Sequence, residues 1–263
     1  MKRPQPDPAW TPEVAEVYRN DLREMWDRDV ERHSYNSYQN QLALYQSLIE
    51  RYGARSVLDV GCAQATLAML LAESGRRVVA VDIRQPFLDY AKNRWEHGEI
   101  DFVCANVFER PRLGTFDVVF ANQIIEHLVY PAELLRILTA YVNPGGVMVV
   151  STPNHDYFRS PLPSYTELGD PKQHEHKQFS AGGGDHFFAY TEEELRAAAR
   201  EAGLEVAEML YFETPFISGH FMVRFLHRLL PVAVLRALDR LALRVAPRRL
   251  AHQLCMVARR PAP

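Results

Sequence analysis

The sequence predicts an α/β fold with a doubly wound, mostly parallel seven-stranded sheet, an antiparallel last strand, N-terminal helices and a helical insertion before the last strand. Two observations lead to this prediction. Short apolar runs of strand-forming residues alternate with segments of helical periodicity, as in parallel sheets joined by crossover helices. The residues from Val57 to Gly75, VLDVGCAQATLAMLLAESG, then place a strand, a glycine-containing turn and a helix in direct succession.

The elements follow in order along the chain. Seven apolar runs are the expected strands: 56–60, 78–82, 100–103, 116–120, 146–151, 204–212 and 252–258. We expect the last run to pair antiparallel with the run before it. Helices are expected over 64–74, 86–97, 131–141 and 191–202. Thr191 and Glu194 form a capping box at the start of the fourth helix, and Gly203 ends it.

The region before the first strand is predicted to be helical. Residues 1–12 are rich in proline and polar residues and are expected to form a mobile tail. Two amphipathic helices are expected over 13–32 and 37–52. The segment 33–40 between them is dense in polar aromatic residues, so Tyr35 or Tyr38 could cover a bound cofactor. A plain connection between the two helices is the other interpretation.

Two insertions interrupt the alternation of strands and helices. Residues 152–186 carry several prolines and glycines and four histidines, and a loop of this length is usually functional or disordered. In 215–250, apolar residues recur at helical spacing: Phe221, Phe225, Leu229, Leu235, Leu238 and Leu241. Arginines occupy the opposite face: Arg224, Arg228, Arg236, Arg240 and Arg244. Pro231 is expected to divide this stretch into two helices.

Length and composition indicate one α/β domain. The chain has 263 residues, of which 47% are hydrophobic and 24% charged. We expect an N-terminal tail and helix over 1–34 and the α/β domain over 35–263. The N-terminus has no apolar core typical of a signal peptide, and no apolar run approaches the length of a membrane span. A cytoplasmic location follows as the expectation.

Cysteines and charges add two further expectations. Cys62, Cys104 and Cys255 are widely spaced and form neither a CxxC pair nor a zinc pattern, which predicts buried thiols in a reducing compartment. The net charge of −3 conceals an asymmetry, because the chain after residue 213 has nine arginines, no lysine and a single acid, Asp239.

The strand, turn, helix and second strand over 56–82 are typical of a nucleoside-binding unit. Gly61 lets the backbone approach a ligand, and Asp82, which ends the second strand, is expected to accept hydrogen bonds from a ribose diol. Asp59 and Gly61 should shape the turn around an amino-acid moiety. Because the turn has no GxGxxG pyrophosphate loop, it favours S-adenosylmethionine over NAD.

Further motifs follow in the expected order. They are Asn106 after the third strand, FDVVF at 116–120, NQIIEHL at 122–128 and NPGG at 143–146. With these motifs, residues 35–212 resemble the class I, Rossmann-like S-adenosylmethionine-dependent methyltransferases, in the branch of the ubiquinone-biosynthesis O-methyltransferases. The resemblance implies a set of cofactor-binding residues: Tyr35, Asp59, Gly61, Cys62, Asp82, Ile83, Asn106, Val107 and Asn122.

The chain departs from the family at three of these places. Asn106 stands where the family usually has Asp near the adenine amino group, and its carbonyl oxygen can accept the same hydrogen bond. Ala63 and Ala65 replace glycines of the commoner form of the first turn, and both are small enough to allow a ligand to approach.

Methyl transfer to a hydroxyl of high pKa requires a base or a metal ion that lowers this pKa. The expected catalytic residues are Glu126, His127 and His186, and the same three could ligate Mg²⁺ or Mn²⁺. His127 acting as a base without metal, or proximity alone, are the alternatives. His155 and Asp156 are expected to line the acceptor pocket.

These residues also resemble a second branch, the small-RNA 3′-end 2′-O-methyltransferases. The pattern E-x-x-E-H of that branch matches Gln123, Glu126 and His127, and a later DH-x-F motif matches 185–191. Gln123 replaces the first Glu, which puts metal affinity in doubt. His174 and His176 are best explained as part of a solvated loop.

We expect a methyltransferase that acts on a hydroxyl of a small molecule or glycan. The alternatives are an RNA 3′-end 2′-O-methyltransferase and a cofactor-binding domain without catalysis. The insertion 215–250 could lie on a membrane, form a dimer contact, cover the acceptor, bind RNA phosphates or be a solvated basic face. Because the rest of the chain is acidic, nucleic acid is not an expected partner.

Overall fold

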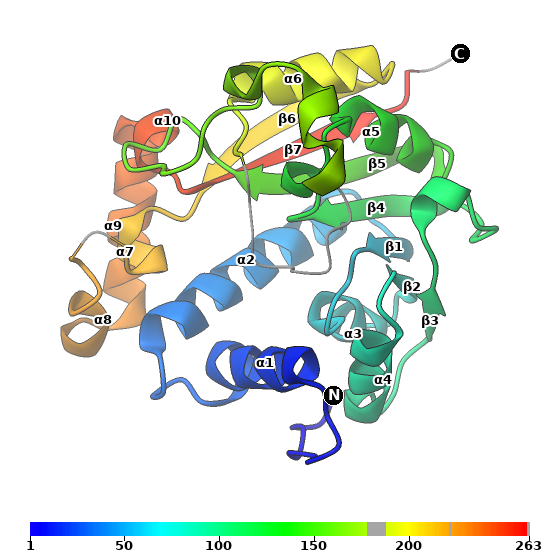
Figure 1. Ribbon diagram of the computed structural model, residues 1–263. Helices are drawn as coiled ribbons and strands as arrows, with labels where there is room; N and C mark the ends of the chain where they lie inside the picture. Colours follow the sequence, from blue (N-terminus) through cyan, green and yellow to red (C-terminus); the bar gives the residue numbers. More distant parts are fainter. Residues whose placement is uncertain (178–187, 221, 262–263) are drawn as a thin grey trace. The chain divides into compact units, whose positions relative to one another are not determined.

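A computed structural model describes residues 1–177, 188–220 and 222–261 (Figure 1). Seven strands in these residues form a mixed sheet in the order β3-β2-β1-β4-β5-β7-β6. Their bounds are β1 Ser56–Val60, β2 Arg77–Asp82, β3 Ile100–Cys104, β4 Phe116–Asn122, β5 Val142–Pro153, β6 Glu205–Phe212 and β7 Gln253–Arg259. Strand β7 runs antiparallel to both of its neighbours, β5 and β6, so the predicted fold class is confirmed.

The chain forms two compact units. The first comprises residues 1–113 and 215–240, and the second comprises 114–214 and 241–263. In the first unit, β1, β2 and β3 are parallel, with Leu58 opposite Val79 and Val79 opposite Asp101. The main helices of this unit are α1 Pro12–Asp21, α2 Arg32–Arg51, α3 Thr66–Glu73 and α4 Gln85–Arg94.

The second unit is built on β4, β5, β7 and β6. Strands β4 and β5 are parallel, and β7 pairs antiparallel with both β5 and β6. The core of β4 is apolar and fully buried from Val118 to Ala121, as expected for a central parallel strand. The helices are α5 Pro131–Thr139, α6 Glu192–Glu201 and α10 Pro247–Leu250. The predicted capping box of Thr191 and Glu194 at the start of α6 is confirmed.

The expected mobile tail is wrong. The backbone N–H of Lys2 donates to the carbonyl of Arg94, and the terminal ammonium of Met1 contacts the carboxylates of Glu73 and Glu96. The first two residues are therefore attached to α3 and to the end of α4, although most side chains of residues 1–12 are exposed. Their partners lie far away in the sequence, so local pattern did not indicate these contacts.

The two N-terminal helices differ from their predicted bounds. The first helix ends at Asp21 and continues as one π-helical turn, Leu22–Trp26. The second begins at Arg32, so the segment 33–40 is part of α2 and is not a connection. Within this segment Asn36 is buried, and its amide contacts the ring of His227, a partner that the sequence did not reveal.

In its described residues, 215–220 and 222–250, the insertion contains four helices, where two were predicted. They are α7 Pro215–Ser218, α8 Leu226–Leu229, α9 Val232–Val245 and α10. The predicted division at Pro231 is confirmed, since Pro231 lies between α8 and α9. In the other insertion, the described residues include two 3₁₀ helices, Thr166–Leu168 and Pro171–Lys177. No helix of the described chain is long and apolar enough to cross a bilayer.

The prediction of three buried thiols is correct only for Cys255. Cys62 is half-buried, and Cys104 is exposed. Cys104 ends β3, which lies at one edge of the sheet and pairs with a strand, β2, along one edge only.

Candidate active site

The turn between β1 and α3 adopts a backbone that favours glycine. Gly61, Ala63 and Ala65 all have positive φ angles, of 66°, 46° and 53°. The N–H groups of Gly61 and Cys62 donate to the carbonyl of Val81 at 2.7 and 3.1 Å, which ties the turn to the end of β2. A left-handed alanine costs about 1 to 2 kcal/mol, and such strain is concentrated at functional sites. The two alanines therefore retain the glycine-like shape of the turn.

Two buried carboxyl groups lie at this turn. Asp82 accepts hydrogen bonds from the N–H groups of Ala63 and Arg84, both at 2.9 Å. Asp59 is 4% exposed, and its burial, together with the nearby Asp82, raises its pKa to about 7. A buried acid of this kind is stabilised in its charged form by a cationic ligand. The ammonium group of a bound methionine moiety is such a cation, so the turn fits S-adenosylmethionine.

The remaining predicted cofactor residues of the first unit lie near strand ends. Ile83 directly follows Asp82 and is 52% exposed, as suits a residue that would contact an adenine ring. Asn106 caps the 3₁₀ turn Val107–Glu109, with its side-chain oxygen accepting from the N–H of Phe108 at 3.0 Å. Val107 is buried, and Tyr35 is half-buried on α2. Burial and the two neighbouring acids raise the pKa of the Cys62 thiol well above its usual value.

Sequence reasoning missed a buried ion pair behind the cofactor turn. The guanidinium of Arg94 lies 2.9 Å from the carboxylate of Asp21 and donates to the carbonyl of Gln64 at 3.0 Å. It also donates to the hydroxyl of Thr66, the first residue of α3, at 3.2 Å. Tyr90 donates to the same aspartate at 2.8 Å. These bonds join α1 and α4 to the turn.

Aromatic packing reinforces this attachment. Trp10 packs edge-on against Tyr90 with ring centroids 5.4 Å apart, and Val14 belongs to the same apolar cluster. Ala63, in the cofactor turn, packs against this cluster. The N-terminal segment thus covers one side of the turn, which the polar sequence of residues 1–12 did not indicate.

The candidate catalytic residues of the second unit follow β4. The strand ends at Asn122, Gln123 has a positive φ of 52°, and a 3₁₀ turn spans Ile125–His127. Glu126 is fully buried and its carboxyl accepts from the hydroxyl of Thr152 at 3.3 Å. Burial raises the pKa of Glu126 to about 8, so this group is largely protonated at neutral pH. His127, the next residue, is half-buried, so it is partly accessible to solvent where Glu126 is not.

The amides of Asn122 and Gln123 are held by two residues that sequence reasoning did not identify. Gln123 donates to the side-chain oxygen of Gln253 at 3.0 Å and to the hydroxyl of Ser151 at 3.3 Å. Ser151 in turn donates to the oxygen of Asn122 at 3.1 Å. Ser151 lies on β5 and Gln253 begins β7, so only the sheet brings these residues together.

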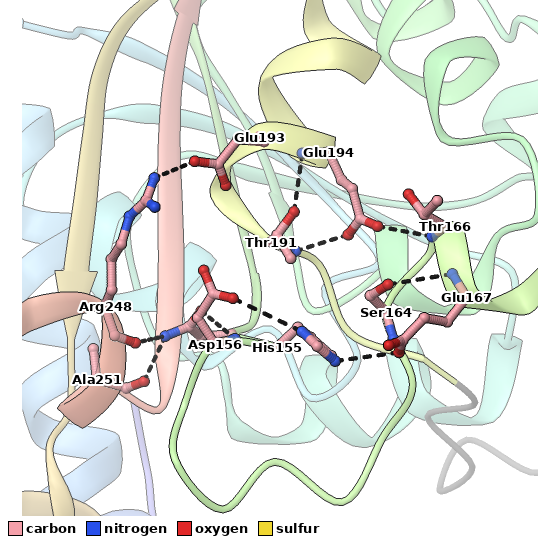
Figure 2. Close-up of polar contacts among 11 residues, drawn as sticks. His155, Asp156, Ser164, Thr166, Glu167, Thr191, Glu193, Glu194, Arg248 and Ala251 are labelled. Atoms are coloured by element: carbon pink, nitrogen blue, oxygen red, sulfur yellow. Dashed lines mark hydrogen bonds and ion pairs between the residues drawn. The ribbon is translucent and has the colours of Figure 1, made fainter.

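The loop after β5 is fixed by polar contacts, which Figure 2 shows. The ring of His155 forms ion-pair contacts with Glu167 at 3.4 Å and with Asp156 at 3.9 Å. The amide of Asn154 donates to the carbonyls of Arg248 and Ala251 at 2.7 and 2.8 Å. The loop is therefore anchored to the segment between α10 and β7, and His155 and Asp156 lie within this network.

Metal ligation remains a prediction. His186 lies outside the described residues, as does the 185–187 part of the motif shared with the RNA enzymes. Within 1–177, 188–220 and 222–261, no three His, Cys, Asp or Glu side chains form a group that could hold a metal ion. His174 and Glu175 instead contact the carbonyl of Leu168 and the hydroxyl of Tyr130.

A family model described as "Methyltransferase domain" matches residues 18–209, which is most of the chain. The chain belongs to this methyltransferase family. The match confirms the family resemblance that the sequence predicted.

Curated relatives of this methyltransferase are about a third identical to it over the aligned parts of their sequences. A "Probable S-adenosylmethionine-dependent methyltransferase" of Mycobacterium tuberculosis is 32% identical over 58% of this chain and 54% of its own length. A ubiquinone biosynthesis O-methyltransferase of Aromatoleum aromaticum is 31% identical over 59% of this chain and 66% of its own. The chain thus spans roughly half to two thirds of the length of these relatives.

Solved structures confirm the fold of the methyltransferase. One is the magnesium protoporphyrin IX methyltransferase of Synechocystis, solved with bound S-adenosylhomocysteine. It superposes with a TM-score of 0.58 at 14% identity, and the aligned region covers 94% of this chain and 95% of the other. The methyltransferase domain of a bacterial Hen1 protein has a TM-score of 0.54 at 20% identity, with coverages of 85% and 98%.

Proposed function

We propose that this methyltransferase acts on a hydroxyl group of a small molecule or glycan, with His127 as the general base. The observation that carries the proposal is the position of His127 on a short 3₁₀ turn after β4, partly exposed, with Glu126 buried beside it. The names of curated relatives such as the Aromatoleum enzyme support an oxygen acceptor.

In this proposal the residues of the first unit bind the donor. Asp82 would accept hydrogen bonds from the ribose hydroxyls and Asp59 would bind the methionine ammonium group, while the left-handed turn would let the backbone approach the ligand. S-adenosylmethionine supplies an electrophilic methyl group on a sulfonium sulfur, so the donor itself needs no further activation. The acceptor does, because a hydroxyl is a poor nucleophile until its proton is removed.

His127 is suited to remove this proton. The neutral imidazole ring has a nitrogen that can accept a proton as the new carbon–oxygen bond forms. The backbone N–H of His127 donates to the carbonyl of Ile124 at 2.9 Å, which fixes the turn that carries the ring. The hydrogen bond from the Thr152 hydroxyl to the buried Glu126 carboxyl ties the same turn to β5.

A divalent ion would use Glu126, His127 and His186, and would supply a positive charge that lowers the pKa of the acceptor hydroxyl. His186 lies outside the described residues, so this donor set stays a prediction. We assign the proton transfer to His127. Calorimetric titration of Mg²⁺ and Mn²⁺ into chelator-stripped protein saturated with S-adenosylhomocysteine tests the metal separately, with His127→Ala as the control.

The proposal is tested with methyl-labelled S-adenosylmethionine and a panel of phenols, catechols, sugars, lipid-linked glycans and short RNAs. For an accepted hydroxyl compound, we expect His127→Ala to lower kcat by roughly 100-fold or more, without weakening the binding of S-adenosylhomocysteine. His97→Ala, at an exposed histidine of the first unit, is the matched control and should retain activity. Turnover confined to RNA, or undiminished turnover in His127→Ala, contradicts the proposal.

A further inference from the structure

The helices α8 and α9 each have one buried side. On α8, His227 is buried, and its ring accepts a hydrogen bond from the amide of Asn36 at 2.9 Å. Arg224, just before this helix, pairs with Glu31 at 2.6 Å. On α9, Leu235 and Asp239 are buried four residues apart and define the inner side of the helix. The buried residues therefore mark the inner side of each helix.

Another side of these helices, together with the residues just before α8, exposes apolar side chains. The described residues expose ten large hydrophobic side chains, and six of them lie between 222 and 245: Met222, Phe225, Leu229, Val234, Leu241 and Val245. Met222 is 85% exposed and Leu229 is 70% exposed. The spacing of 234, 241 and 245 places those three side chains on one face of α9, and Phe225 and Leu229 are four residues apart across α8.

A third side carries positive charge. Arg236, Arg240 and Arg244 follow each other at intervals of four residues along α9, so they share a face, and Arg228 lies on α8. None of these four arginines forms an ion pair with an acid in the part of the chain that the structure describes. The only acid between residues 215 and 250 is the buried Asp239.

From these three sides we infer that α8 and α9 form a docking surface for an anionic membrane. Exposed apolar side chains with arginines on an adjacent face are the arrangement of helices that lie in a bilayer interface. The apolar side chains would enter the boundary between headgroups and acyl chains, while the arginines would contact anionic lipid phosphates. Arginine is suited to this position because its long stem reaches outward and its guanidinium binds phosphate oxygens in pairs.

The charged and apolar side chains of this surface together favour an anionic membrane over a second copy of the chain or an RNA. In a symmetric dimer the same face would meet its copy, and the unpaired arginines would be brought together without a neutralising acid. RNA would neutralise the arginines but would leave Leu229, Val234 and Leu241 without an apolar partner. An anionic bilayer satisfies both sets of side chains.

The test is vesicle flotation of the whole protein. We expect the protein to float with vesicles that contain phosphatidylglycerol and not with pure phosphatidylcholine vesicles, and binding should weaken with salt. The triple variant Arg228→Gln, Arg236→Gln, Arg240→Gln should bind anionic vesicles roughly 100-fold less tightly. The double variant Phe225→Ser, Leu229→Ser, at exposed sites, should lose about tenfold or more.

Matched controls separate this surface from general charge and hydrophobicity. The triple variant Arg28→Gln, Arg112→Gln, Arg200→Gln changes the net charge equally at exposed arginines elsewhere, and Val30→Ser removes an exposed apolar side chain outside the insertion. Both should float like the wild type. The inference is overturned if the wild type stays in the soluble fraction with anionic vesicles, or if the control triple variant loses as much binding. A wild-type dimer that Leu229→Ser dissociates, without vesicle binding, would assign the surface to a second copy of the chain.

Discussion

Arg94 and Asp21 form an ion pair in which neither side chain is exposed to solvent, with 2.9 Å between the guanidinium and the carboxylate. The pair lies directly behind the cofactor turn, since Arg94 also donates to the carbonyl of Gln64 and the hydroxyl of Thr66. Tyr90 provides a further hydrogen bond to Asp21. One arginine thus connects the N-terminal helix α1, the helix α4 and the turn at which we expect the donor to bind.

The first prediction concerns this pair. Because Arg94→Ala leaves the Asp21 carboxylate buried without its counter-ion, we expect the free energy of unfolding to fall by about 3 to 5 kcal/mol. Urea denaturation measures this change. The control is Arg32→Ala, which removes an exposed pair with Asp29 and should cost less than about 1 kcal/mol. Equal losses in the two variants would contradict the role assigned to Arg94.

The second prediction concerns the pH dependence of cofactor binding. The pKa of Asp59 is raised to about 7 by burial and by Asp82, so this group is partly protonated in the free protein. A bound ammonium favours the charged carboxylate, so binding should release a proton below pH 7. The affinity for S-adenosylhomocysteine should therefore fall by up to about tenfold per pH unit between pH 7 and 5.5.

Calorimetry in two buffers of different ionisation enthalpy detects the released proton. In Asp59→Asn, which keeps the shape of the side chain, we expect weaker binding that no longer changes with pH over this range. An affinity of the wild type that is constant from pH 5.5 to 7 would show that Asp59 does not contact the cationic group.

The third prediction concerns the attachment of α8. Burial and the nearby His33 lower the pKa of His227 to about 4, whereas the ordinary value in the unfolded chain is about 6.5. Between these values the unfolded state binds the proton and the folded state does not, so stability is lost as the pH falls from 6.5 to 4. Compared with wild type, His227→Gln should lessen this loss by about 1 to 3 kcal/mol.

Thermal or urea unfolding at several pH values gives the comparison. Gln retains a side-chain oxygen that can accept from Asn36, so the hydrogen bond to α2 can persist. His97→Gln, at an exposed histidine, should leave the pH profile unchanged. If the two histidine variants have the same profile, His227 is not responsible for the acid sensitivity.

The fourth prediction concerns Gln253, whose side-chain oxygen accepts from Gln123. In Gln253→Leu the amide of Gln123 loses this acceptor next to the candidate catalytic turn, which should cost about 1 to 3 kcal/mol in stability. We expect kcat to fall by roughly tenfold while the affinity for S-adenosylhomocysteine is unchanged, because the cofactor turn is not altered. Gln253→Glu keeps an accepting oxygen and should recover part of the loss. An unchanged kcat in the leucine variant would remove Gln253 from the positioning of this turn.

The fold and the cofactor turn were predictable because they depend on local pattern. Apolar runs predicted all seven strands, with bounds that differ from the observed ones by at most four residues. The residues from Asp59 to Asp82 that we expect to bind the donor lie within one strand–turn–helix–strand unit. The capping box of α6 was likewise local. In each case the interacting residues are neighbours in the sequence or belong to one recurrent motif.

The rest depends on partners that are distant in the sequence. Asp21 and Arg94 are separated by more than 70 residues, and Gln123 and Gln253 by 130. No periodicity links such pairs, since each is formed only when helices pack or strands of the sheet align. The attachment of the N-terminal residues to α3 and α4 was missed for the same reason. The sequence also could not reveal which sides of α8 and α9 are buried.

The central claim is that the acceptor atom is oxygen and that His127 removes its proton. The most direct measurement uses S-adenosylmethionine labelled with carbon-13 in the methyl group and reads the carbon shift of the product by NMR, for the wild type and for His127→Ala. We expect a methyl carbon bonded to oxygen in the wild-type product, and its rate of formation to fall by roughly 100-fold in the variant. A methyl carbon bonded to nitrogen or carbon, or an equal rate in the two proteins, would contradict the account.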